Sequence, residues 1–338
     1  MRALWMMGAA LIGSIGLGST GGAWAETLPA KPRIVEIQNP QQRAIADRLL
    51  LTGRRLAQQG EPLAAIPQVQ RAIALYQQLR DDRAAAYGLG VLAEIQGQAR
   101  RLAEVAETGR QLRGYGNTLQ EPIAQMAAEN HIALPVLQSG ERGAFAAANQ
   151  RAQDLGRRYQ HNLTQAIALD QQGQMHAKAG NLTAAIARYN TGLPFRYPLR
   201  DRLGEAHTRL LRGEALTAQT ETRAALADYG IARVLAIQVN RSDLRDEAAA
   251  GLIANYRETG NYWRAAELYQ DRTGIALETQ DLDTAARWQR ELGDLYQHEL
   301  KDRERARLAY ETALEFARLA RNDLEVRESW LRLQRLGE

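Results

Sequence analysis

The residues that could do chemistry are few in this chain, and they are not grouped as catalysis or metal binding requires. The 338-residue sequence has no cysteine, which excludes thiol catalysis, disulfides and metal sites with cysteine ligands. No two histidines stand at metal-ligand spacing, and no HExxH, GxSxG or GxxxxGK(S/T) motif occurs. The histidines are His131, His161, His176, His207 and His298. We therefore expect a protein that is not an enzyme and that has no metal site and no cofactor.

One pair of charged residues has a spacing that suits an anion. Arg287 and Arg290 lie three positions apart, so a helix would place both guanidinium groups on one face. Arginine can hold a carboxylate or a phosphate through two parallel hydrogen bonds. The pair is therefore a candidate anion site, although a solvated charged surface would use the same residues.

The composition excludes several other classes of protein. Apolar residues make up 45% of the chain and charged residues 24%, which is typical of a folded protein rather than a disordered one. The net charge is only +4 and no run of five basic residues occurs, so we do not expect nucleic-acid binding.

A repeat with a period near 40 residues must position the charged side chains. The tyrosines Tyr189, Tyr229, Tyr269 and Tyr310 are separated by 40, 40 and 41 positions. Alanines and glycines recur in phase with them, and a fixed period in this range indicates a repeat architecture. The residues in phase are Ala185, Ala225, Ala265 and Ala306, then Gly173, Gly213 and Gly293, with Ile253 in the one gap.

The clearest unit spans residues 166–193 and reads as two helices. The first ends near Gly180, which can adopt the left-handed conformation that closes a helix, and Asn181 can cap the second. The second helix repeats apolar residues at spacings of three and four, as one buried face requires. We expect Pro194 to end it, because proline cannot continue the hydrogen-bond ladder.

This unit resembles the tetratricopeptide repeat family. The resemblance rests on Gly173 and Ala185, the small residues where the two helices approach, and on Tyr189, the large residue that packs against the next unit. It implies an all-α, right-handed superhelical solenoid, with the tyrosines in the core between units rather than in a binding stripe. Turns near residues 60, 97, 140, 180, 220, 260 and 301 predict about seven antiparallel helix pairs. Residues 322–336 would add a C-terminal capping helix that covers the last unit with a stripe of Leu324, Trp330, Leu333 and Leu336.

The N-terminus resembles a secretory signal peptide. Arg2 precedes an apolar stretch at residues 3–18, and Ala23-Trp24-Ala25 suits a signal peptidase that cleaves before Glu26. An uncleaved membrane anchor is the alternative, although the stretch is short for a span. We expect an exported protein in the periplasm or an equivalent compartment, with no stable membrane span after cleavage. The predicted regions are a signal peptide at 1–25, an extended leader at 26–43, degenerate helical pairs at 44–158, and regular repeats with the capping helix at 159–338.

In the tetratricopeptide repeat family the first helix of each pair lines the concave groove, where a protein or peptide partner binds. Some members hold a partner's C-terminal carboxylate with Lys and Asn, but Asp170, Leu210, Ala250 and Arg290 stand at the equivalent points here. Helical phase assigns to the groove Asp170, Gln174, Lys178, His207, Glu214, Glu247, Arg257, Arg287, Arg290, Asp294 and His298.

Two functions are compatible with these observations. The first is an exported, non-catalytic scaffold or adaptor that binds a protein or peptide in its groove and assists assembly of an envelope or membrane complex. The alternative is a carbohydrate- or peptidoglycan-associated accessory module of a cell-wall enzyme, with Trp263 and Trp288 in contact with glycan. Neither hypothesis fixes the oligomeric state.

Overall fold

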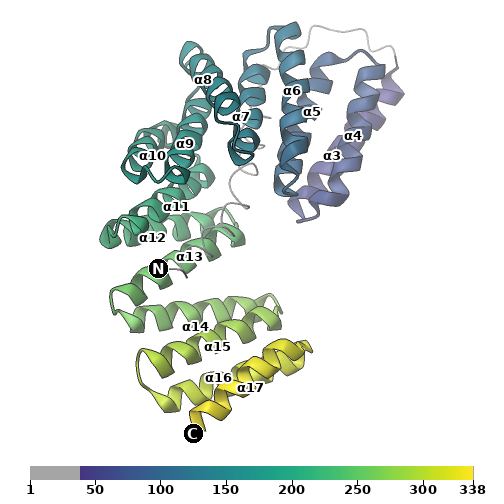
Figure 1. The fold of residues 1–338 in the computed structure, drawn as a ribbon. Helices are drawn as coiled ribbons and strands as arrows, with labels where there is room; N and C mark the ends of the chain where they lie inside the picture. Colours follow the sequence, from purple (N-terminus) through teal and green to yellow (C-terminus); the bar gives the residue numbers. More distant parts are fainter. Residues whose placement is uncertain (1–38, 338) are drawn as a thin grey trace. The chain divides into compact units, whose positions relative to one another are not determined.

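Almost every part of the chain that can be described is helical. The computed structural model describes residues 39–337, which contain fifteen α-helices, one 3-10 helix and no strand (Figure 1). This confirms the predicted all-α class. The signal peptide and most of the leader fall outside the described residues. Residues 40–43, predicted to be extended, already belong to the first helix, because Asn39 caps it by accepting a hydrogen bond from the Gln42 amide at 3.1 Å.

The chain separates into two compact units, Met1–Ala215 and Leu216–Glu338. The boundary predicted between residues 158 and 159 therefore lies inside the first unit. The helices of the first unit are α3 (Pro40–Gln58), α4 (Pro62–Gln78), α5 (Asp82–Gln98), α6 (Leu102–Leu119), α7 (Pro122–Gln138), α8 (Arg142–Arg158), α9 (Asn162–Lys178), α10 (Leu182–Arg196), η1 (Tyr197–Leu199) and most of α11 (Arg202–Ala218).

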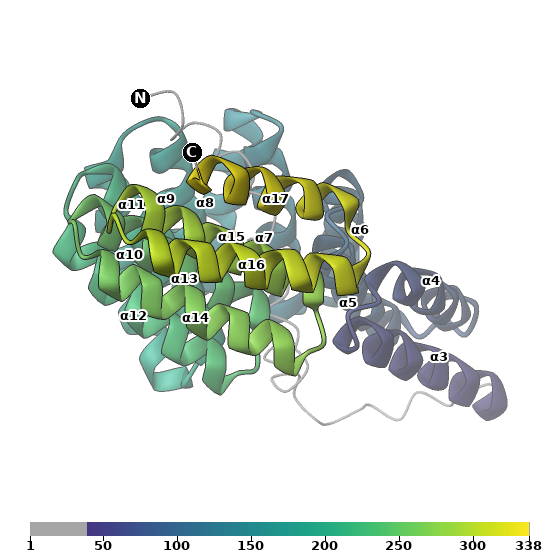
Figure 2. The same cartoon turned by 90° about the horizontal axis from the view of Figure 1, so that it is seen from below.

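The second unit consists of helices stacked in sequence order, as Figure 1 shows for α14 to α17, and Figure 2 views the same helices from below. Within residues 39–337 the helices follow one another in sequence as seven successive pairs, from α3/α4 to α15/α16, and α17 comes last as the capping helix. The helices after α11 are α12 (Thr222–Gln238), α13 (Ser242–Glu258), α14 (Tyr262–Glu278), α15 (Leu282–His298), α16 (Arg303–Ala320) and α17 (Asp323–Gly337).

The turns between helices share one geometry and recur about every twenty residues. At most of them a residue with positive φ follows the helix, and two backbone N–H groups bond back to its last turn. At the first, Gly60 has φ +84° and donates to the Ala57 carbonyl at 3.1 Å, while Glu61 donates to the Leu56 carbonyl at 2.9 Å. This is the Schellman arrangement, which satisfies carbonyls at the end of a helix. The 40-residue period is thus two helices of about 17 residues with two short turns.

Two details of the expected helix ends are wrong. Gly97 lies within α5, and the turn comes later, with Arg100 in the left-handed conformation. Pro194 does not end α10, which continues to Arg196 before η1. A proline close to a helix terminus removes a single backbone hydrogen bond, so the last turn survives it.

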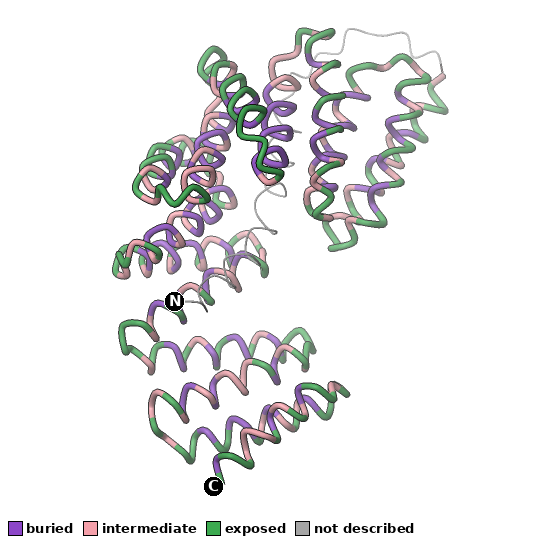
Figure 3. The backbone as a smooth tube through the Cα atoms, in the orientation of Figure 1, coloured by how far each residue is buried: buried purple, intermediate pink, exposed green. Residues whose placement is uncertain are grey.

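The four phased tyrosines lie in the core, as the repeat predicted. Tyr189, Tyr229, Tyr269 and Tyr310 are all buried. Figure 3 shows that buried positions recur along the helices. In the first unit Tyr189 belongs to a cluster with Leu211 and Ala215 of the next pair. Burial of such large aromatic rings is a main source of stability in a repeat protein, because one helix pair cannot cover its own apolar face.

The capping helix uses a different face from the one predicted. Leu336 is buried and Leu333 packs against the same cluster, but Leu324 and Trp330 are exposed. The buried positions of α17 are Glu325, Ser329 and Leu336. Leu324 precedes the buried Glu325, and Trp330 follows the buried Ser329. Neighbouring residues of a helix point in different directions, so both side chains face solvent.

Candidate functional site

A recess of about 320 Å³ lies in the C-terminal unit among α13, α15 and α17. The first two are first helices of their pairs, and α17 follows the last pair in the same position. Three of the predicted groove residues, Arg257, Asp294 and His298, line it together. The complete lining is Arg257, Glu291, Asp294, Gln297, His298, Arg332 and Arg335.

Helix α15 supplies the centre of the recess. Glu291, Asp294 and His298 follow one another at spacings of three and four, so they share one face of the helix. The helix begins cleanly because the Asp281 carboxylate accepts a hydrogen bond from the Thr284 amide at 3.1 Å. Beside this face Leu295, four residues after Glu291, is buried in the core, which fixes the rotation of the helix.

Ion pairs hold the charged side chains of the recess in place. Arg332 Nε donates to Asp294 Oδ1 at 2.7 Å, and Arg332 Nη1 donates to Glu328 Oε2 at 2.8 Å. Burial alone would lower the pKa of Arg332, but these two carboxylates outweigh it and raise the pKa. Across the recess Arg257 Nη2 lies 3.0 Å from Glu299 Oε1. The site therefore presents arginines that are already oriented by carboxylates, which is a pre-organised polar surface.

Arg287 and Arg290 do not form the predicted anion site. Arg290 pairs with Glu325 and lies 3.3 Å from Glu291 and 3.6 Å from Asp294, so its charge is already matched. The Arg287 guanidinium lies over the Trp288 ring, 5.3 Å from its centroid. An anion would have to displace carboxylates from one residue of the pair.

Asp170 and His207 are also wrong as groove residues, because both are buried. The Asp170 carboxylate pairs with Arg196, which is only 3% exposed, and accepts a hydrogen bond from Thr208 Oγ1 at 2.8 Å. Arg196 also pairs with Asp201. Burial raises the pKa of Asp170, while Arg196 and Thr208 oppose that rise. These residues form a structural ion cluster among α9, α10 and α11.

The remaining predicted residues lie outside the recess. Gln174, Glu214 and Glu247 are half-buried and Lys178 is exposed. Sequence reasoning missed four residues that do line it, namely Glu291, Gln297, Arg332 and Arg335. The last two stand three apart on α17, a spacing visible in the sequence but assigned there to capping alone.

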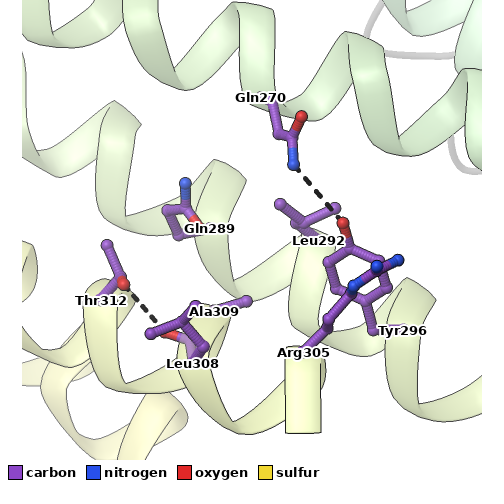
Figure 4. Close-up of a pocket in the computed structure, with 8 residues that line it drawn as sticks. All are labelled: Gln270, Gln289, Leu292, Tyr296, Arg305, Leu308, Ala309 and Thr312. Atoms are coloured by element: carbon purple, nitrogen blue, oxygen red, sulfur yellow. Dashed lines mark hydrogen bonds between the residues drawn. The ribbon is translucent and has the colours of Figure 1, made fainter. Parts of the chain in front are cut away.

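A second pocket, also of about 320 Å³, lies among α14, α15 and α16 (Figure 4). Its polar groups converge from all three helices onto an apolar floor. The Tyr296 hydroxyl accepts a hydrogen bond from Gln270 Nε2 at 3.4 Å, and the Trp263 ring meets the Tyr296 ring edge-on with centroids 6.2 Å apart. The lining residues are Gln270, Gln289, Leu292, Tyr296, Arg305, Leu308, Ala309 and Thr312.

Within residues 39–337, no group of three or more His, Cys, Asp or Glu side chains is placed to hold a metal ion. Over the same residues, every helix is too short or too polar to cross a bilayer.

Comparison with known proteins identifies the fold. No protein-family model matches the chain, and no curated protein sequence matches it. Among solved structures, the apo form of RapI gives a TM-score of 0.52 at 12% identity, over 81% of this chain and 97% of RapI. A signal transduction ATPase with numerous domains from Pyrococcus horikoshii, which has a tetratricopeptide repeat sensor, gives a TM-score of 0.50 at 12% identity.

That second match covers 89% of this chain but 54% of the ATPase, so the chain spans about half the length of that protein. Likeness at such low identity concerns the fold alone. Together with the phased helix pairs and the buried tyrosines, it identifies the chain as an all-α helical solenoid that resembles tetratricopeptide repeat proteins.

Proposed function

We propose that this protein is a non-catalytic scaffold that binds a protein or peptide at the recess of its C-terminal unit. The observation that carries the proposal is the meeting of Arg257, His298 and Arg335 from three different helices in one recess. Solenoids of stacked helix pairs commonly bind partners along the surface made by equivalent helices. Fixed arginines are favourable anchors for such partners, because they donate several hydrogen bonds in a defined plane.

We further propose that the protein acts outside the cytoplasm and assists assembly of an envelope or membrane complex. The support for this is the N-terminal pattern of Arg2, the apolar residues 3–18 and the Ala23-Trp24-Ala25 sequence. Expression in the source cells followed by N-terminal sequencing tests it. A mature chain that starts at Glu26 in the extracytoplasmic fraction is the expected result, and an intact Met1 in the cytoplasm would refute export.

Site-specific photo-crosslinking tests the recess itself. In one variant a photo-reactive residue replaces His298 in the recess. In the matched control it replaces the exposed Glu311 on α16. Both variants are produced and irradiated in the source cells. We expect one defined crosslinked protein from position 298 and none from position 311. The Arg335→Glu variant should lose that product, while Arg307→Glu, an exposed site outside the recess, should keep it. Equal products from both positions, or none from either, would contradict the proposal.

Of the two tryptophans assigned to the alternative, a glycan-binding accessory module, only Trp263 has an accessible ring. Trp288 is half-buried under Arg272, whose guanidinium lies 3.7 Å from the ring centroid, so its face is not open to a sugar. Trp263 is 51% exposed. Sedimentation of the mature protein with purified cell wall tests this alternative, and a protein that stays in the supernatant would exclude it.

A further inference from the structure

The pocket among α14, α15 and α16 has a chemistry of its own, separate from the recess described above. Its two partner helices, α14 and α16, are second helices of their pairs, and no lining residue is shared between the two sites. Figure 4 shows Gln270 and Arg305 approaching Tyr296 from opposite helices. The volume of about 320 Å³ falls at the lower end of the roughly 300–1,000 Å³ of ligand sites, which suits one or two small rings.

Arg305 provides a cation that is held mainly by aromatic rings and only loosely by a carboxylate. Its guanidinium lies 4.8 Å from the centroid of the Trp263 ring and 6.0 Å from that of Tyr296. Stacking uses the face of a guanidinium and leaves the N–H groups along its edge available. Arg305 Nε forms a long ion pair with Asp302 Oδ2 at 3.5 Å, which lacks a strong hydrogen bond. No lining residue is acidic, so Arg305 sets the charge of the pocket.

Two carboxamides face the same space as this cation. Gln270 makes only the long 3.4 Å bond to Tyr296, and Gln289 makes no hydrogen bond to any residue within 39–337. A carboxamide both donates and accepts, so it can bind a hydroxyl group in either role. Two of them on adjacent helices suit a ligand with several hydroxyl groups.

The floor of the pocket is apolar. Leu292, Leu308 and Ala309 line it, and Leu308 is 64% exposed. Thr312 turns its hydroxyl back to the Leu308 carbonyl at 2.8 Å, which leaves its methyl group to the surface. A ring with C–H groups on one face would cover this floor and remove it from water.

From these features we infer that the pocket binds an acidic saccharide, that is, a sugar ring that bears a carboxylate. The carboxylate pairs with the edge of Arg305, ring hydroxyl groups bond to Gln270 and Gln289, and the C–H face of the ring packs on Leu292 and Leu308. A small dicarboxylic acid would satisfy Arg305 but leave both carboxamides without a partner. A neutral sugar would use the carboxamides and leave the edge of Arg305 without a ligand carboxylate. The inference does not depend on the proposed protein partner.

Isothermal titration of the mature full chain tests the site with four probes: galacturonic acid, its trisaccharide, a neutral galactose trisaccharide and glutarate. We expect binding of an acidic sugar, as monomer or trisaccharide, and at least about tenfold weaker binding of the neutral sugar and of glutarate. The monomer indicates a free sugar acid as ligand, and the trisaccharide alone indicates a polymer. Glutarate or the neutral sugar bound equally well, or no binding at all, would overturn the inference.

Variants place the binding in this pocket. Arg305→Gln should weaken binding of the acidic sugar about tenfold or more, because a charge-assisted hydrogen bond is lost. Arg307→Gln, on the same helix but outside the pocket, is the matched control and should bind as the wild type does. Gln289→Ala removes no hydrogen bond within residues 39–337. It therefore provides a second test of binding in the pocket, which holds even if Arg305→Gln does not fold. Unchanged binding in Gln289→Ala and Arg305→Gln would overturn the inference.

Discussion

The ring of Tyr310 fills the space beside Gly293, where any other residue would need room for its side chain. A Cβ atom placed on Gly293 would lie 2.5 Å from Cδ1 of Tyr310, well inside contact distance. Gly293 belongs to α15 and Tyr310 to α16, so this contact sets how closely the two helices of the last pair approach. Gly173 and Tyr189 repeat it in α9 and α10, where the distance to Cε1 would be 2.3 Å.

Gly293→Ala should therefore destabilise the protein by about 1–3 kcal/mol, because the added methyl group overpacks the core. Chemical denaturation followed by circular dichroism measures the free energy of unfolding. Gly274 in α14 is the matched control, since a Cβ there meets nothing within 4 Å. Gly274→Ala should stabilise by about 0.5–1 kcal/mol through helix propensity. Equal effects of the two substitutions would contradict the packing argument.

Tyr310→Phe separates the ring from its hydroxyl group. The hydroxyl lies 2.8 Å from Asp294 Oδ1 and 2.7 Å from Gln297 Oε1, both residues of the recess. We expect a loss of about 1 kcal/mol for the missing hydrogen bond, and about 3–5 kcal/mol for Tyr310→Ala, which also empties the core. Denaturation midpoints of the two variants measure the difference. A Phe variant as unstable as the Ala variant would show that the hydroxyl, rather than the ring, carries the contact.

Arg196→Met should be among the most damaging single substitutions in the first unit. It leaves Asp170 and Asp201 without their cation, and breaking a buried ion pair costs about 3–5 kcal/mol. Asp170→Asn should cost less, about 1–3 kcal/mol, because Arg196 keeps Asp201. The exposed pair Arg264–Glu267 is the control, and Arg264→Met should change stability by no more than about 0.5 kcal/mol. Thermal melts of the three variants rank them, and the reverse order would contradict the buried cluster.

His131 should make stability depend on pH. Burial lowers its pKa from 6.5 to about 4, so between these values the unfolded chain binds a proton that the folded chain does not. The free energy of unfolding contributed by this group is full above pH 6.5 and falls by roughly 3 kcal/mol as the pH drops to 4. His131→Leu should remove that part of the slope in urea titrations at several pH values. An equal change of slope in His176→Gln, at a half-buried site, would contradict the assignment.

The sequence predicted the elements of this fold better than the contacts of its side chains. Period, helix pairs and most turns are local properties, since Gly60, Gly180 and Gly260 mark turns by themselves. Helical phase assigns a face, and Arg257, Asp294 and His298 from that face line one recess. Asp170 failed because its burial depends on Arg196, and no rule of phase identifies that partner. Arg332 and Arg335 were missed for a related reason, since they reach the recess only when α17 docks.

The left-handed turns have a consequence for the durability of the molecule. Within residues 39–337, ten residues other than glycine have positive φ, among them Arg80, Asn240 and Gln280, and four glycines do. For most of those ten, the left-handed conformation costs roughly 1–2 kcal/mol each. This conformational cost lies at the turns between helices, where glycine would not incur it. Glycine substitutions at these turn positions would therefore raise the free energy of unfolding without altering the recess or the pocket.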